Sequence, residues 1–377
     1  MKIGIITFHH APNQGAVLQA YALQTLLESW GHHVEFIDYR PLHVFNCRDF
    51  IAKSPKRLLE KWQNQVCGFI YRNFKKDFNK VLHINNRRYY SVEELRANPP
   101  VFDLYITGSD QVWNFLRKID GPYVLDFVPA DKPKIAYAAS MGQCNIPKHL
   151  HAELRNLLSS FQAISVREKN GKDFIDELMT GYEIDICQTL DPTLLIVQKS
   201  YEGIAEPTRF KQPYLVSYIL SMLEKGHEEI LKYVQDKCKM PILNMRNPDT
   251  CVRLPFAKNK IVTPYQFLSY IKHSSLVVCS SFHAVVFSLI FHKPFIVLVP
   301  SMLKSKGGNQ RINSLLSPLG LSRRCVYSFE SHVIDELLNE DIDWDFIDAE
   351  IKNTAQTSIK FLQDSIVSIQ QTPYFPL

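Results

Sequence analysis

The chain has 377 residues, of which 46% are hydrophobic and 21% charged, and its formal net charge is +5. This length predicts two domains, and a composition so rich in apolar residues excludes a largely disordered chain. Eight scattered cysteines without a CxxC pair exclude a disulfide scaffold and the common zinc spacings, so we expect reduced thiols and neither metal nor cofactor. No signal peptide and no apolar run long enough for a membrane span are visible, which predicts a cytoplasmic protein.

The first forty residues predict a strand, a helix and a second strand. Residues 2–8 form a short, mostly apolar strand, Asn13 can cap the following helix, and residues 33–39 form the next strand. A strand–helix–strand connection of this length indicates a parallel sheet.

A basic segment follows, and we expect residues 42–98 to form a helical insertion in the first domain. Between Arg48 and Arg88 there are eleven Lys or Arg and three acidic residues. Aromatic side chains alternate with the basic ones, so a cationic amphipathic helix at an anionic membrane surface is one interpretation. A solvated basic face on a packed helix is the other, and neither interpretation includes nucleic acid.

The rest of the chain alternates between strands and helices, which predicts two Rossmann-like α/β domains facing a cleft. We assign residues 1–200 to the N-terminal domain and 207–342 to the C-terminal domain, with a helix over 343–370 packing back across both. Strands are expected at 102–107, 134–138, 163–166, 214–219, near 242, at 276–279 and at 295–299, and helices at 149–160, 173–179, 228–237, 265–271 and 284–291.

Polar clusters follow the strands, where ligands usually bind. The first is Asn13-Gln14-Gly15, which suits a sugar but is also a helix cap with a turn glycine. The second is 107–114, in which Ser109, Asp110, Gln111 and Trp113 offer hydroxyl-binding groups and an aromatic surface. A capped helix start with a core tryptophan explains it equally well.

Three further loops carry weaker signals. Residues 138–142 are small, which permits close backbone approach or simply tight packing. Arg167 ends a strand and could bind a carboxylate or phosphate, although a surface pair with Glu168 is the alternative. Asp191 precedes a proline, and for it we favour a turn over a catalytic base.

The last candidates lie in the second domain. His283 is preceded by Ser281 at a predicted helix start, which is an unfavourable place for a charged histidine unless an anion lies beside it. Lys306 and Arg311 flank a glycine-containing loop that could close over a ligand or be a flexible surface loop.

Seven segments together resemble the polysaccharide pyruvyl transferase family in order and spacing. They are "KIGIITFHHAPNQGAVLQAYAL", "GHHVEFIDYRP", "YITGSDQVWN", "KIAYAASMG", "ISVREKNG", "LDPTLL" and "SSFHAVVFSLIFHKPFI". The resemblance implies a glycosyltransferase-B-like fold. It also implies transfer of pyruvate from phosphoenolpyruvate to two hydroxyls of a sugar, with release of phosphate, and a lipid-linked sugar is one candidate acceptor.

The resemblance also implies roles for residues. Arg167 and His283 match the family's donor-contacting arginine and histidine, whereas Ala284 replaces the usual glycine and Ser281 a frequent arginine. Donor binding is therefore expected from Arg167, Ser281, Arg311 and Lys306, and acceptor binding from Asn13, Gln14, Gly15, Ser109, Gln111 and Trp113. His283 is the expected acid, and Asp110 and Glu168 are unranked candidates for the base. A nucleotide-sugar glycosyltransferase of the same fold and a non-catalytic glycan-binding protein remain the alternatives.

Overall fold

The computed structural model describes residues 1–11, 13–40, 81–208, 210–220, 223–246, 252–306 and 309–371. The chain divides into two compact units, and each is described by itself. Unit 1 comprises Met1–Pro12, Ala16–Leu195 and Ala355–Leu377, and unit 2 comprises Asn13–Gly15 and Ile196–Thr354.

Unit 1 contains a seven-stranded sheet with the order β3-β2-β1-β4-β5-β6-β7, in which all neighbouring strands are parallel. In the central pairings, Ile3 is in register with both Val34 and Leu104. The strands are β1 (Lys2–Ile6), β2 (His33–Tyr39), β3 (Ile84–Tyr89), β4 (Leu104–Thr107), β5 (Lys134–Ala139), β6 (Ala163–Val166) and β7 (Asp185–Gln188).

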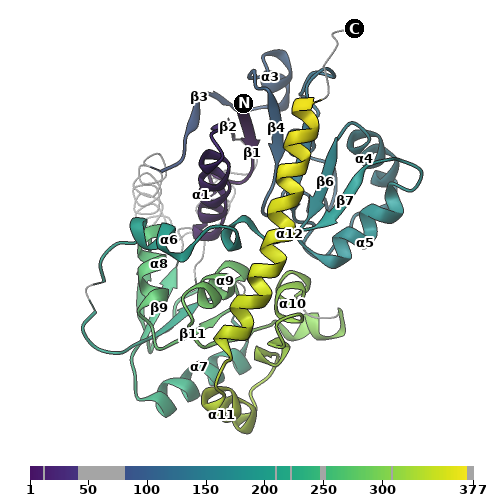
Figure 1. The fold of residues 1–377 in the computed structure, drawn as a ribbon. Helices are drawn as coiled ribbons and strands as arrows, with labels where there is room; N and C mark the ends of the chain where they lie inside the picture. The colour runs from purple at the N-terminus through teal and green to yellow at the C-terminus, as the bar shows by residue number, and fades with distance from the viewer. Residues whose placement is uncertain are drawn as a thin grey trace, which may run out of the picture. The chain divides into compact units, whose positions relative to one another are not determined.

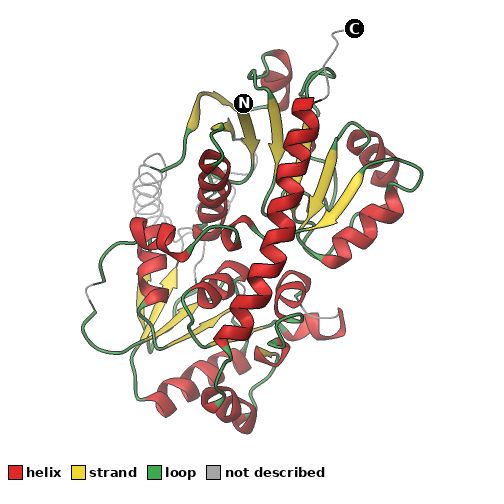
Figure 2. Ribbon diagram, viewed as in Figure 1, coloured by secondary structure: helices red, strands yellow, loops and turns green. Residues whose placement is uncertain are grey.

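Helices cover this sheet, which is why its central strands are continuous apolar runs rather than alternating patterns (Figure 2). Helices α4 and α5 flank β6 and β7, as Figure 1 shows. The helices of unit 1 are α1 (Gln14–Ser29, whose first two residues belong to unit 2), α3 (Val92–Ala97), α4 (His151–Leu158) and α5 (Lys169–Leu178), with 3₁₀ turns η2 (Gly121–Val124), η3 (Lys148–Leu150) and η4 (Pro192–Leu194).

Unit 2 contains a six-stranded parallel sheet with the order β10-β9-β8-β11-β12-β13. Its strands are β8 (Leu215–Tyr218), β9 (Ile242–Arg246), β10 (Lys258–Ile261), β11 (Leu276–Cys279), β12 (Phe295–Leu298) and β13 (Cys325–Val326). Its helices are α6 (Gln198–Ile204), α7 (Lys225–Cys238), α8 (Pro264–Lys272), α9 (Phe282–Ile290), α10 (Gln310–Leu316) and α11 (Ser331–Asn339), with η5 (Ser301–Lys306) and η6 (Ser322–Arg324). Helix α12 (Trp344–Gln371) begins in unit 2 and ends in unit 1.

The two strand orders share one feature that decides where a ligand can bind. In each sheet the chain starts at a central strand, runs outward to one edge, and then resumes on the other side of that strand. The reversals lie between β1 and β4 in unit 1 and between β8 and β11 in unit 2. Loops that leave neighbouring strands in opposite directions open a crevice at such a point.

The predicted α/β class and the alternation of strands and helices are confirmed, and the predicted C-terminal helix over 343–370 is α12. The predicted insertion over 42–98 is partly wrong, since its described portion contains strand β3. The segment INNRRY lacks a hydrophobic pattern because β3 is an edge strand with exposed side chains. Residues 42–80 lie outside the described residues.

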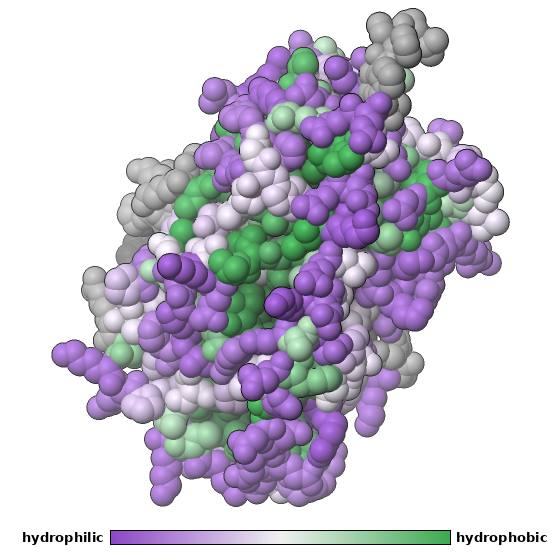
Figure 3. Space-filling view, in the orientation of Figure 1, coloured by the Kyte–Doolittle hydropathy of each residue, from purple (hydrophilic) through white to green (hydrophobic). Residues whose placement is uncertain are grey.

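The unit limits differ from the predicted domains at two places. The chain passes from unit 1 to unit 2 between Leu195 and Ile196, whereas Asn13–Gly15 falls in unit 2 rather than in the predicted 1–200 domain. On the face in Figure 3, hydrophilic residues predominate around smaller apolar patches. In the described part of the chain, no helix combines the length and hydropathy needed to cross a membrane.

Arg324 is a fully buried side chain that links three elements of unit 2. Its Nη1 donates to the Phe295 carbonyl at 3.0 Å, and its Nη2 to the Glu340 carboxylate at 2.9 Å. Burial lowers the pKa of the guanidinium, and Glu340 acts in the opposite direction.

We predict that Arg324→Ala costs roughly 1–3 kcal/mol, because the buried Phe295 carbonyl loses its donor. Glu340→Gln is expected to cost less than about 1 kcal/mol, because the Glu340 side chain is 40% exposed and water screens the pair. Urea unfolding of both variants measures the difference. Equal losses would show that the ion pair, and not the carbonyl contact, supplies the stability.

Candidate functional site

Three strands of unit 1 bring predicted residues together in one buried polar network. Ser109 follows β4, Arg167 and Glu168 follow β6, and Asp191 follows β7. Arg167 donates through Nε to Glu168 at 3.1 Å and through Nη1 to Asp191 at 2.7 Å. The Ser109 hydroxyl donates to the same Asp191 oxygen at 3.1 Å.

The remaining carboxylate oxygens of this network also have donors. Glu168 accepts from the Ser140 hydroxyl at 2.6 Å and from the Met141 backbone N–H at 3.2 Å. Asp191 accepts from the backbone N–H and the hydroxyl of Thr193 at 3.0 and 2.7 Å. Each of the four carboxylate oxygens accepts at least one hydrogen bond, which is the condition under which buried charges are tolerated.

The Arg167–Glu168 pair is therefore not the surface pair that the sequence allowed. The exposed fraction of the side chain is 3% for Arg167 and 0% for both Glu168 and Asp191. Burial by itself lowers the pKa of Arg167, but the charges of Glu168, Asp191 and Asp110 outweigh it and hold the pKa above its ordinary value. One guanidinium between two carboxylates leaves this trio with an excess of one negative charge.

The loop after β4 has the geometry of a tight turn. Gly108 has φ of +108°, and a side chain there would lie 2.2 Å from the Tyr137 carbonyl. Asp110 has φ of +69° and accepts the Gln111 backbone N–H at 2.8 Å. Ser109 is fully buried, whereas Gln111 is half-buried and lies against Gly142.

Trp113, proposed to cover a sugar, is a core residue. Its side chain is 0% exposed, its Nε1 donates to the Tyr123 carbonyl at 2.8 Å, and its ring packs edge-on against Phe161. An aromatic ring whose faces are both packed has no surface to offer a sugar. The core interpretation therefore describes Trp113.

A second cluster forms within unit 2, where the first and last polar motifs meet. Gly15 lies against the imidazole of His283, so closely that a side chain on Gly15 would lie 2.0 Å from Nδ1. His283 is in the first turn of α9, directly after β11, and is 7% exposed. Only glycine permits this approach. Because His283 directly follows β11, it lies at the strand reversal of the unit 2 sheet.

The neighbours of Gly15 and His283 hold this arrangement in place. Gln14 donates to the Val262 carbonyl at 2.8 Å and accepts from the Tyr218 hydroxyl, so its amide is engaged within unit 2. Asn13 caps α1, as predicted, by accepting the Gly15 backbone N–H at 2.9 Å. Ser281 caps α9 by accepting the Ala284 backbone N–H at 3.4 Å.

The other two residues predicted to bind the donor, Lys306 and Arg311, follow His283 in the chain and belong to η5 and α10. Arg311 is half-buried in the first turn of α10, and Lys306 ends η5 with a side chain outside the description. Sequence reasoning gave Asp191 a turn role, which it has, but missed its bond to Arg167. Its position at a parallel strand's end, one strand away from Arg167, was the available signal.

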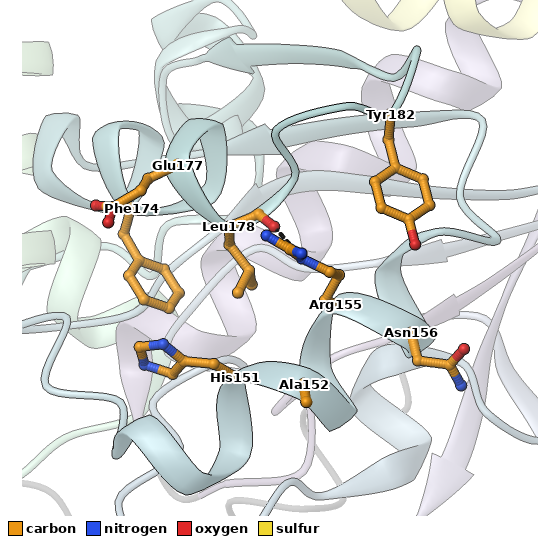
Figure 4. A pocket seen from close by; sticks show the side chains of 8 residues that line it. All are labelled: His151, Ala152, Arg155, Asn156, Phe174, Glu177, Leu178 and Tyr182. Atoms are coloured by element: carbon orange, nitrogen blue, oxygen red, sulfur yellow. Dashed lines mark hydrogen bonds between the residues drawn. The ribbon is translucent and has the colours of Figure 1, made fainter.

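A surface groove of about 430 Å³ lies between α4 and α5, and none of the residues lining it belongs to the predicted site (Figure 4). Arg155 crosses it to donate to the Leu178 carbonyl at 2.5 Å, and His151 packs edge-on against Phe174. Hydrophobic residues show among hydrophilic ones on this part of the surface (Figure 3). In the described ranges, His, Cys, Asp and Glu form no group suited to a metal ion.

We predict that Gly15→Ala lowers the free energy of unfolding by about 1–3 kcal/mol and shifts the NMR resonances of the His283 imidazole, because the added methyl forces the two apart. Gly203→Ala is the matched control, since Gly203 lies in α6 with no atom within 4 Å of the added carbon. Urea unfolding and ring ¹⁵N spectra measure both variants. A Gly15→Ala protein as stable as Gly203→Ala would contradict the contact.

Known proteins share this architecture. The UDP-GlcNAc 2-epimerase from Methanocaldococcus jannaschii aligns with a TM-score of 0.51 and 13% identity over 97% of this chain and 100% of its own. The UDP-GlcNAc 2-epimerase from Neisseria meningitidis gives 0.51 and 10% over 98% and 100%, and the spinosyn forosaminyltransferase SpnP gives 0.51 and 11% over 98% and 99%. At such identities the likeness shows the fold alone, which is the glycosyltransferase-B-like class with two α/β units.

No curated protein sequence matches the chain. The family model described as polysaccharide pyruvyl transferase matches residues 13–301, from the Asn13 cap to the start of η5. The matched segment contains both clusters, including Arg167 and His283. Because the match extends over more than half of the 377 residues, this chain belongs to the polysaccharide pyruvyl transferase family.

Proposed function

We propose that the protein transfers pyruvate from phosphoenolpyruvate to two hydroxyls of one sugar in a polysaccharide precursor, forming a cyclic ketal and releasing phosphate. Membership of the family supports the reaction class. The observation that carries the proposal is His283, held against Gly15 at the strand reversal of the unit 2 sheet. Ketal formation needs a proton at the methylene carbon of the donor, and a histidine fixed at a ligand-binding edge can supply it.

The reaction balances as follows. The methylene carbon of phosphoenolpyruvate takes a proton from His283 and becomes a methyl group, while one sugar hydroxyl bonds to the central carbon. The bond between that carbon and the phosphate oxygen breaks, and the second hydroxyl forms the second ketal bond. Of the two hydroxyl protons, one restores the histidine and the other leaves on the hydrogen phosphate.

The contacts of Asp110 and Glu168 distinguish these two candidates for the general base. Both oxygens of Glu168 accept hydrogen bonds from Arg167, Ser140 or Met141, and its side chain is fully buried. Asp110 is 9% exposed, and the contact described for its side chain is with the Gln111 N–H. We therefore assign the base to Asp110 and the anchoring of Arg167 to Glu168.

The hydrogen bonds of the predicted binding residues also indicate which of them can contact the donor or the acceptor. Arg167 lies between two carboxylates, so a trianionic donor would have to compete with them for its guanidinium. We assign Arg167 to holding the loops after β4 and β7, and the donor's charge to Ser281, Arg311 and Lys306. Gln111 and Asn13 are the proposed acceptor contacts, whereas the amide of Gln14 positions Gly15.

Incubation with carbon-14-labelled phosphoenolpyruvate and a panel of nucleotide-linked and lipid-linked sugars tests the donor. We expect the carbon label to enter the sugar together with release of one phosphate for each ketal. A parallel series with labelled UDP-sugars tests the alternative of a glycosyltransferase. Label moving only from the UDP-sugar would overturn the proposal, and label moving from neither donor would favour a non-catalytic binder.

His283→Gln is expected to lower turnover by about 10²–10⁴-fold, because the amide keeps the shape of the site but cannot donate the proton. His292→Gln is the matched control. His292 follows α9 at its opposite end, where a 42% exposed side chain pairs with Asp348 at 3.0 Å. Turnover is measured at saturating phosphoenolpyruvate, with the melting temperature as a check on folding. Near-normal turnover of His283→Gln would show that the proton comes from another group.

A further inference from the structure

Three cationic or titratable side chains converge on one buried carboxylate at the ends of β1, β2 and β3. We call this the β1–β3 basic cluster; it consists of His9, Asp38, Arg40 and Arg88. Asp38 accepts from Nε of Arg40 and from Nε of Arg88, the latter at 2.8 Å. Nε2 of His9 lies 3.5 Å from Asp38, while its Nδ1 lies 3.2 Å from the Thr7 carbonyl.

The cluster carries an excess of positive charge. Burial would raise the pKa of Asp38, but the adjacent His9 imidazole and the charge of Arg40 prevail and hold it well below its ordinary value. Asp38 is therefore a carboxylate at neutral pH. Two guanidinium groups against one carboxylate leave one net positive charge, even when His9 is neutral.

The arrangement directs the carboxylate inward and one arginine outward. The exposed side-chain fraction is 3% for Asp38, 10% for Arg40 and 36% for Arg88. A guanidinium has five N–H donors. In the part of the chain that the structure describes, hydrogen bonds engage Nε of Arg40 and both Nε and Nη1 of Arg88, whose Nη1 donates to the Tyr90 hydroxyl at 3.4 Å. Further N–H groups of both arginines are thus held in fixed positions for an additional acceptor.

The other polar network of unit 1 has the opposite charge balance. Arg167 shares its guanidinium between Glu168 and Asp191, which leaves a negative excess around it. An anion that binds unit 1 is therefore attracted to the β1–β3 basic cluster and repelled from the Arg167 network. Planar guanidinium groups fixed at the carboxyl ends of parallel strands are suited to phosphate oxygens.

We propose that the β1–β3 basic cluster binds the phosphate or diphosphate group of the acceptor, which would then be a phosphorylated sugar carrier rather than a free glycan. This inference rests on the proposed function, which assigns the donor's charge to residues of unit 2 and therefore leaves an anion site in unit 1 to the acceptor. Two kinds of acceptor contain the same chemical group, a sugar diphosphate, which is attached either to a nucleoside or to a polyprenyl lipid.

Titration calorimetry with inorganic pyrophosphate tests the site without any turnover. We expect Arg88→Ala to weaken pyrophosphate binding by roughly 10- to 100-fold, as for loss of a hydrogen bond to a charged group. Arg87→Ala is the matched control, because Arg87 precedes Arg88 in β3 and stacks over Tyr89 instead. Arg88→Lys should recover part of the affinity, which a purely structural role of Arg88 would not require.

Equal pyrophosphate affinity of Arg88→Ala and Arg87→Ala, or no binding to the unsubstituted chain, would overturn the proposal. Competition by UDP-sugars or by short-chain polyprenyl diphosphate sugars then identifies the source of the diphosphate. Loss of phosphoenolpyruvate affinity alone in Arg88→Ala would instead make the cluster a donor site and also overturn it. If pyrophosphate binding depends on Arg88 but no pyruvyl transfer occurs, the anion site is confirmed and the proposed function is wrong.

Discussion

Parallel pairing of the strands is the constraint on which the rest of the structure depends. In a parallel sheet every strand ends at the same edge, so residues distant in sequence become neighbours without any loop being long. Ser109, Arg167 and Asp191 follow three different strands and nonetheless share hydrogen bonds. The same constraint brings Asp38 and Arg88 together from β2 and β3. The chemistry of both units is built from strand ends.

Charge balance then separates two networks that look alike in sequence. Both have a buried carboxylate and arginine at strand ends, but Arg167 is shared between two acids, whereas Asp38 is shared between two arginines. The first network is internally satisfied and negative, which suits the anchoring of loops. The second is positive and includes the half-exposed Arg88, which suits an anionic ligand. A count of arginines along the chain does not make this distinction.

The close approach of Gly15 to His283 links backbone geometry to the proposed proton transfer. A general acid acts only from a fixed position, because small displacements of a catalytic group reduce rates strongly. Here the position is set by a missing side chain at Gly15, by the Ser281 cap of α9 and by the contact of Gln14 with Tyr218. Gln14 and Gly15, which were expected to bind the acceptor, thus hold His283, the proposed general acid, in position.

The sequence by itself determined the α/β class, the alternation of elements and most polar strand ends, because apolar periodicity and capping residues are local signals. It did not reveal strand β3, whose exposed edge position leaves no hydrophobic pattern. The partners of Arg167, the burial of Trp113 and the membership of Asn13–Gly15 in unit 2 were decided by the tertiary structure alone. Each depends on which strands become neighbours and on which faces are covered, and strand order and burial are properties of the whole fold rather than of any segment.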